Sequence, residues 1–474
     1  MRPLLAVTLA TIALSCAQGA PEDERIALIE SAIQPSLVIT GDSTPHPTLA
    51  ERMEELDVPG VSVAVIDGGR VAWAKGYGLA DKERNIPVTP ETMFQAASIS
   101  KPVAGMAALK MVQDGQLDLD ANVNEYLTSW QIPDNQFTTE HKVTLRGLLN
   151  HSAGTTVWGF PGYHRDSTIP STVGVLDGQG NTDSIRVWKE PGESWRYSGG
   201  GYTVMQLMMA DAAGRPFAQL MDEMVLGPLE MANSTYEQPL PERRHAQAAT
   251  AYRGDATAVP GNWHVYPEMA AAGLWTTPTD LAKYALEVQH AYAGEGVVLG
   301  QEITREMLVP GMNDHGLGPG ISEDRQRFGH GGSNAGFRSQ LTGFTEGGRG
   351  AVVMTNSDNG GRLAQELLLT IFAAYGWEGL EPNVKTPVTL QPEQYEAVAG
   401  QYRLAESGDT ITITYQDGRL EAIAFGDDEG MQLLAESPTE FFLRRDGTPV
   451  RFEMNDGPAT AVVVAGSLRG ERIQ

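Results

Sequence analysis

Ser98 and Lys101 stand three residues apart, within the stretch from Phe94 to Met106. Three residues along a helix place two side chains on one face, so this hydroxyl and this amine could share a proton. A serine beside such an amine is a candidate nucleophile. A lone S-x-x-K pattern is weak, because about one chance match is expected in a chain of this length. Its weight depends on what the rest of the sequence supplies.

The pair would be carried by a helix. Apolar and small residues surround most of the stretch from Val103 to Val112, which predicts a buried helix. Pro102 is tolerated in the first turn of a helix but not further in. The helix is therefore expected to begin near Ser98.

Two later segments could supply the remaining groups, namely Tyr197-Ser198-Gly199 and His330-Gly331-Gly332-Ser333. The order and spacing of these motifs resemble the serine β-lactamase and penicillin-binding-protein superfamily, especially its branch of large β-lactamases, D-amino-acid peptidases and related esterases. The resemblance covers roughly residues 45–375, and several motifs in order make it specific where one alone was not. Supporting segments are 145–154, 271–281 and 336–339.

By that resemblance Ser98 is the acylated nucleophile, Lys101 accepts its proton, and Tyr197 relays protons to the leaving group. The physics agrees, since a buried lysine loses its charge through desolvation and a neutral amine can take a hydroxyl proton. The oxyanion would lie between the N–H groups of Ser98 and Ser333. Gly331 and Gly332, just after His330, would leave room for a small-molecule or peptide-like substrate.

Two departures from the family pattern bear on the substrate. Gly199 stands where penicillin-recognising members carry the asparagine of Tyr-x-Asn, which removes an amide that would hold the acyl side chain. His330 stands where they carry the lysine of Lys-Thr-Gly, and a histidine is mostly neutral at pH 7. Esters or peptide-like amides are therefore favoured over strong β-lactam hydrolysis. Arg338 is a candidate for the lost cation, or else a surface residue.

Other interpretations compete with this one. Taken alone, Tyr197 would more often be a packed aromatic residue, and His151 and His330 would more often be structural. An α/β-hydrolase, favoured by Gly331 to Ala335, needs a histidine after its serine, and none follows His330. A catalytically silent sensor or binding protein on the same fold stays open because of Gly199. No H-E-x-x-H motif is present and Cys16 is the sole cysteine, so neither a metal nor another cofactor is expected.

Charge excludes one class of partner. Sixty acidic residues against 34 basic ones give a net charge of −26, which repels phosphate backbones, so nucleic acid is not an expected partner.

The N-terminus predicts export. Arg2 precedes an apolar run, residues 4–14, which is too short for a membrane span and is typical of a signal peptide over residues 1–19. Ala17-Gln18-Gly19 fits ordinary cleavage, whereas the segment from Ala13 to Cys16 resembles a lipobox that would tether the protein to a membrane through Cys16. Both alternatives predict a secreted or periplasmic protein.

The remaining pattern predicts an α+β fold. Strands early in the chain, helices in the middle and strands again after Gly329 predict one β-lactamase-like domain over residues 24–378, whose sheet joins distant parts of the chain. A proline-containing linker is expected over 379–392. A small all-β, barrel-like domain is expected over 393–474, where apolar and polar residues alternate along segments that are separated by turns such as Asp417-Gly418. This last domain resembles the lipocalin-like module that often follows the hydrolase domain.

Overall fold

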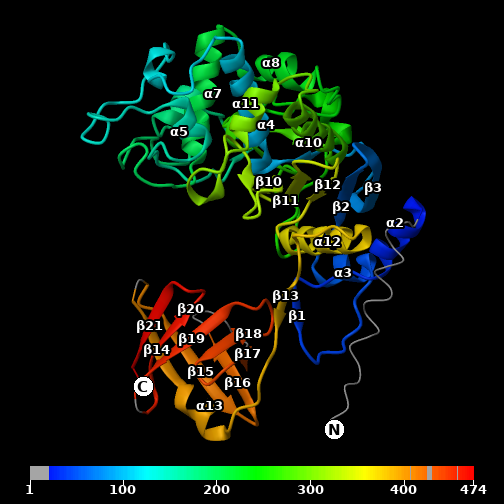
Figure 1. Ribbon diagram of the computed structural model, residues 1–474, viewed down its shortest axis with the longest axis vertical. Helices are drawn as coiled ribbons and strands as arrows, with labels where there is room; N and C mark the ends of the chain where they lie inside the picture. The colour runs from blue at the N-terminus through cyan, green and yellow to red at the C-terminus, as the bar shows by residue number, and fades with distance from the viewer. Residues whose placement is uncertain (1–20, 406, 424–429, 456, 474) are drawn as a thin grey trace. The chain divides into compact units, whose positions relative to one another are not determined.

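The structure is a computed structural model that describes residues 21–405, 407–423, 430–455 and 457–473 (Figure 1). The predicted signal peptide, residues 1–19, and Cys16 lie outside these residues. The chain forms two compact units. The first consists of the described part of Met1–Ile33 together with Pro47–Gly379, and the second of Gln34–His46 together with Leu380–Gln474.

The first unit is built on a seven-stranded sheet in the order β4-β3-β2-β12-β11-β10-β9. Its neighbouring strands pair antiparallel, and β2 pairs with β12 although almost the whole unit separates them in sequence. The strands are β2 (Gly60–Asp67), β3 (Arg70–Asp81), β4 (Ile86–Pro87), β9 (Gly320–Ile321), β10 (Arg327–Asn334), β11 (Phe337–Phe344) and β12 (Gly350–Thr355). The predicted sheet of distant chain parts is confirmed.

Helices cover both faces of this sheet. All six residues of β12 are buried, and the strand contacts both α10 (Pro278–Ala293) and α12 (Gly360–Tyr375). Because successive residues of a strand point to opposite faces, a strand buried throughout needs a layer on each side. The short helices α2 (Glu22–Ser31) and α3 (Leu49–Glu55) lie with α12 (Figure 1). Arg52 on α3 forms an ion pair with the fully buried Glu366 of α12 at 2.7 Å.

The other helices form the region that carries most of the predicted motifs. Helix α4 (Ser100–Gln113) is buried along nearly its whole length and contacts α7 (Gly199–Ala213), α8 (Phe217–Met221) and α9 (Met269–Ala272). This agrees with the apolar surround that the sequence predicted. Further helices are α5 (Leu145–Leu149), α6 (Thr172–Leu176) and α11 (Gln301–Met307). Two-stranded pairs join β5 (Phe94–Gln95) with β8 (Trp275–Thr276) and β6 (Tyr163–His164) with β7 (His264–Val265).

Side-chain caps fix where several of these helices begin. The Ser198 hydroxyl accepts a hydrogen bond from the Gly201 N–H at the start of α7, and Thr277 caps α10 in the same way. Thr48 and Glu51 form a reciprocal capping box at the start of α3. Such caps satisfy N–H groups that have no partner within the helix.

The second unit is a closed barrel of eight strands, β14 to β21 in order. The strands are β14 (Gly400–Leu404), β15 (Thr410–Gln416), β16 (Arg419–Ile423), β17 (Met431–Ala435), β18 (Glu440–Leu443), β19 (Pro449–Met454), β20 (Ala459–Val464) and β21 (Leu468–Arg472). Helix α13 (Pro392–Val398) precedes them, and its Val398 is fully buried in the barrel core. The predicted barrel-like fold is confirmed.

The division between the units differs at one place from the expected boundaries of 24–378, 379–392 and 393–474. Residues 34–46 group with the second unit, because β1 (Leu37–Ile39) pairs in parallel with β13 (Asn383–Lys385). Arg444 adds an ion pair to Asp42 at 3.0 Å. The expected linker therefore carries a strand and the first residue of α13.

Within the described residues no helix is both long enough and apolar enough to cross a membrane.

Candidate active site

Ser98 lies in a 3₁₀ turn, Ala97–Ile99, that leads directly into α4, so the predicted position near a helix start holds with a tighter first turn. Ser98 itself is partly exposed, while the residues on either side of it are buried. Ala97 has a φ of 50°, in the left-handed region that costs a non-glycine residue about 1 kcal/mol or more. Strain of this kind gathers at functional sites, where the surroundings hold a side chain in a required direction.

Strand β10 packs directly against this turn. A Cβ atom on Gly332 would lie 2.2 Å from the Ala96 carbonyl oxygen and 3.2 Å from the Ala97 Cβ, so only glycine allows the approach. The short strand β9 pairs only with Phe328 and Gly329. The segment from His330 to Ser333, which the sequence assigned to substrate and oxyanion binding, thus lies beside Ser98 with one backbone edge unpaired among the described strands.

Lys101 is 2% exposed, and its Nζ lies 3.0 Å from the Ser98 Oγ and 2.8 Å from the carbonyl oxygen of Ala271. Neither partner is a carboxylate, and no acid forms an ion pair with Lys101 among the described residues. Burial lowers the pKa of Lys101 to about 7. At neutral pH, Lys101 is therefore a neutral amine in a substantial fraction of the molecules.

Tyr197 precedes the start of α7 and completes the predicted group. The centroid of its ring lies 4.8 Å from the Lys101 Nζ, and its hydroxyl is close enough to the Ser98 side chain to be influenced by it. Burial raises the pKa of Tyr197 well above its usual value, an effect that the nearby Ser98 side chain partly offsets. The structure thus brings together the three side chains predicted to be catalytic.

His330 is neutral in this setting. Its Nδ1 lies 2.5 Å from the Gly331 carbonyl oxygen, and since a carbonyl can only accept, Nδ1 carries the proton. Its Nε2 is a buried acceptor with no partner among the described residues. Burial, together with nearby Lys101 and His315, lowers the pKa of His330 to about 3.

Two further histidines belong to the site and were not assigned to it from the sequence. The His151 ring packs on the Tyr197 ring with 4.3 Å between centroids, and the His151 Nδ1 accepts a hydrogen bond from the Ser198 N–H at 3.1 Å. His315 lies 4.8 Å from His151 and 6.0 Å from His330 between ring centroids. The sequence favoured a structural role for His151, because nothing in the residues around it indicated a contact with Tyr197.

Arg338 does not replace the missing cation. Its guanidinium donates hydrogen bonds to the carbonyl oxygens of Asn334 and Phe337, and it pairs with Asp358 at 3.0 Å. The guanidinium charge is therefore neutralised at the turn between β10 and β11.

Gly199 is required by packing. A Cβ atom there would lie 3.0 Å from the Phe160 ring and 3.2 Å from the Trp158 carbonyl oxygen. The space beside Tyr197 that an asparagine would need is thus occupied by the loop that carries Trp158 and Phe160.

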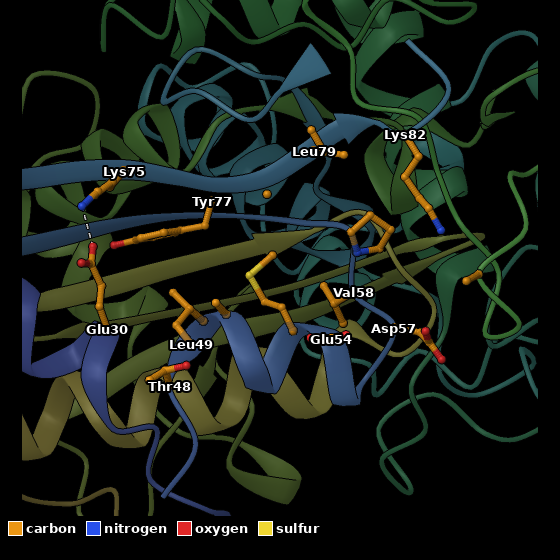
Figure 2. A pocket seen from close by; sticks show the side chains of 15 residues that line it. Glu30, Thr48, Leu49, Glu54, Asp57, Val58, Lys75, Tyr77, Leu79 and Lys82 are labelled. Atoms are coloured by element: carbon orange, nitrogen blue, oxygen red, sulfur yellow. Dashed lines mark hydrogen bonds and ion pairs between the residues drawn. The ribbon is translucent and has the colours of Figure 1, made fainter. Parts of the chain in front are cut away.

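No group of three or more His, Cys, Asp or Glu side chains in the described part of the chain is arranged to hold a metal ion. A cavity of about 600 Å³ lies elsewhere in the first unit, between α3 and β3 (Figure 2). Leu49, Met53 and Leu79 line it, and the Glu30–Lys75 ion pair stands at one end. None of the predicted site residues lines this cavity. In the sheet, β2, β12 and β11 separate β3 from β10.

An antiparallel sheet between helices, with a serine, a lysine and a tyrosine gathered beside its strand β10, defines the class of serine β-lactamases and penicillin-binding proteins. The chain belongs to the beta-lactamase family, whose family model matches residues 47–375.

Relatives within this class include esterase EstB of Burkholderia gladioli, 29% identical over 204 residues, which are 41% of this chain and 51% of the relative. Protein flp of Staphylococcus aureus is 22% identical over 309 residues, which are 63% of this chain and 60% of the relative. The chain thus spans about half to three fifths of these two curated relatives.

Solved structures show the same fold. The octameric penicillin-binding protein homologue from Pyrococcus abyssi has a TM-score of 0.61 and 21% identity, over 89% of this chain and 98% of that one. The D-amino acid amidase from Ochrobactrum anthropi has a TM-score of 0.57 and 22% identity, over 69% of this chain and 96% of that one.

Proposed function

We propose that the protein is a serine hydrolase that cleaves ester or amide bonds through an acyl-enzyme on Ser98. The observation that carries the proposal is the buried Lys101 Nζ, 3.0 Å from the Ser98 Oγ and without a carboxylate partner among the described residues. A neutral amine at that distance is a general base for the hydroxyl. The family membership and the similarity to an esterase support this reaction class.

In the proposed reaction Lys101 takes the Ser98 proton as Oγ attacks the substrate carbonyl carbon. The N–H groups of Ser98 and Ser333 would stabilise the oxyanion. Collapse of this intermediate breaks the bond to the alcohol or amine, which leaves with a proton relayed through the Tyr197 hydroxyl. Water then attacks the acyl carbon, and the acid is released with Ser98 regenerated. D-amino-acid peptides and β-lactams are further candidate substrates of the same steps.

Turnover of a panel of nitrophenyl esters, D-amino-acid peptides and β-lactams, by the wild type and by Ser98→Ala, tests the proposal. We expect hydrolysis of at least one member by the wild type, and a loss of about 10³-fold or more in Ser98→Ala. Equal rates in the two proteins would contradict the proposal. Binding of a panel member without turnover would instead indicate the silent sensor that Gly199 left open.

We also propose that the protein acts outside the cytoplasm, on the basis of its N-terminal sequence alone. Mass spectrometry of the mature protein distinguishes cleavage after Gly19 from lipidation at Cys16. An N-terminus at Met1 in the exporting host would contradict both.

A further inference from the structure

An exposed tryptophan lies beside the proposed catalytic group. Trp158 exposes 65% of its surface, and its ring centroid is 5.4 Å from that of Tyr197. Phe160, two residues further along, is partly buried and packs over Gly199. Trp158 and Phe160, here called the aromatic wall, therefore present an apolar surface next to Tyr197.

The backbone that carries the aromatic wall is held in place. The N–H of Gly199 donates to the Trp158 carbonyl oxygen at 2.9 Å, and the N–H of Gly200 donates to the Val157 carbonyl oxygen at 3.0 Å. Val157 has a φ of 64°, which is an outlier for a β-branched residue. Backbone strain of this kind gathers at active sites and ligand-binding sites, which is where the exposed Trp158 ring lies.

The same hydrogen bonds remove a possible anion site. The first N–H groups of a helix attract anions, but in α7 those of Gly199 and Gly200 already donate to carbonyl oxygens. A substrate carboxylate would have to find its partner elsewhere.

The two arginine side chains next to these motifs are already engaged. Arg338 is paired with Asp358, and the Arg196 guanidinium stacks 4.4 Å from the Trp188 ring centroid. His330 adds no cation either, because its proton lies on Nδ1 and its ring is neutral. The site therefore favours an uncharged group where penicillin-recognising relatives would hold an anion.

We propose that the Ser98 site selects uncharged substrates whose acyl group is apolar or aromatic and packs on the aromatic wall. This inference rests on the proposed function, because it concerns the substrate of the same acylation step.

Three nitrophenyl esters test the selectivity, because they share a leaving group and differ in the acyl part. They are the esters of 3-phenylpropanoic acid, of butyric acid and of glutaric acid, the last as its anionic half-ester. For the wild type we expect kcat/KM to fall about tenfold from phenylpropanoyl to butyryl, the size of one aromatic contact. We expect glutaryl to be slower again.

Variants assign each effect to a residue. Trp158→Ala should lower kcat/KM for phenylpropanoyl about tenfold and change butyryl less than about twofold, with Trp158→Phe intermediate. Trp188→Ala removes a tryptophan that is 42% exposed and stacks on Arg196, and it is the matched control, expected to keep the preference. His330→Lys should raise kcat/KM for the glutaryl ester about tenfold relative to kcat/KM for the butyryl ester, because it adds a cation.

Labelling of each variant with a fluorophosphonate separates this inference from the proposed function. An unlabelled wild type contradicts the proposed function itself. A wild type that is labelled, yet hydrolyses the three esters at similar kcat/KM, overturns the inference alone. The same holds if Trp158→Ala and Trp188→Ala change the preference equally.

Discussion

The Nζ of Lys101 lies 3.0 Å from the Oγ of Ser98, and its second partner is the carbonyl oxygen of Ala271 at 2.8 Å. A carboxylate in either place would hold the ammonium form, whereas a hydroxyl and a carbonyl leave desolvation as the main influence on the pKa of Lys101. The Lys101 amine is thus within hydrogen-bonding distance of the Ser98 hydroxyl and has a lowered pKa, and a general base requires both.

Activity should depend on pH through Lys101. Because the neutral amine is the active form and burial brings the pKa of Lys101 to about 7, kcat/KM should rise about tenfold per pH unit below 7 and level off above it. Lys101→Arg keeps a fixed charge and should lower kcat/KM by about 10²–10⁴. Lys110→Arg, on the same helix and paired with Asp114, is the control. A profile flat from pH 5 to 9 would refute this role.

His151 should act by positioning Tyr197. It accepts the Ser198 N–H and packs on the Tyr197 ring, and its own φ is 64°. His151→Ala leaves that buried N–H unpaired, at a cost of about 1–3 kcal/mol, and should lower kcat more than it changes KM. His151→Asn retains an acceptor and tolerates the left-handed backbone, so it should recover part of kcat. A loss of thermal stability with unchanged kcat would assign His151 a structural role only.

Restoring the family asparagine at Gly199 should fail. The new Cβ would meet the Phe160 ring at 3.0 Å, so Gly199→Asn should cost about 1–3 kcal/mol of stability through overpacking. We expect a lower Tm and no gain in β-lactam hydrolysis. Gly159→Ala lies in the same loop with no atom within 4 Å of its new Cβ, so its Tm should not change. Efficient β-lactam turnover by Gly199→Asn would contradict the role assigned to the loop.

Glu268 should make stability depend on pH. Both carboxyl oxygens are buried without a hydrogen-bond partner among the described residues, and burial raises the pKa of Glu268 to about 8. In the unfolded chain this carboxyl ionises near pH 4.3. Between about pH 4.3 and pH 8 the folded state therefore keeps a proton on Glu268 that the unfolded state has lost. Stability should therefore fall between about pH 4.3 and pH 8, by about 1.4 kcal/mol per pH unit from this group, and change no further above that.

Glu268→Gln removes this dependence and should raise Tm at pH 8 more than at pH 5. Glu287, also buried, accepts the N–H groups of Val297, Val298 and Leu299, so Glu287→Gln should be destabilising at both pH values. Parallel Tm changes in the two variants would contradict the assignment.

The sequence predicted the local parts of this site and missed the parts that depend on tertiary contacts. The spacing of Ser98 and Lys101, and a proline allowed only in a first turn, placed the pair at the start of α4. His151 gave no local signal, since its role comes from a contact with Tyr197 that forms only in the fold. Arg338 carried the right charge, but the sequence could not show its pairing with Asp358.

The fold shows the same division. The alternation of apolar and polar residues, broken by turns, predicted the barrel, because its neighbouring strands are also consecutive in the sequence. Strand β1 pairs with β13, and most of the first unit lies between these two strands in sequence. A strand of three residues is also too short to show a periodic pattern of its own. Residues 34–46 were therefore expected in the first domain.

Intact-mass measurement after treatment with a fluorophosphonate, followed by peptide mapping, tests the central claim most directly. The account predicts a single adduct on the wild type, located on the peptide that contains Ser98, and none on Ser98→Ala. A wild type without an adduct, or an equal adduct on Ser98→Ala, would contradict it.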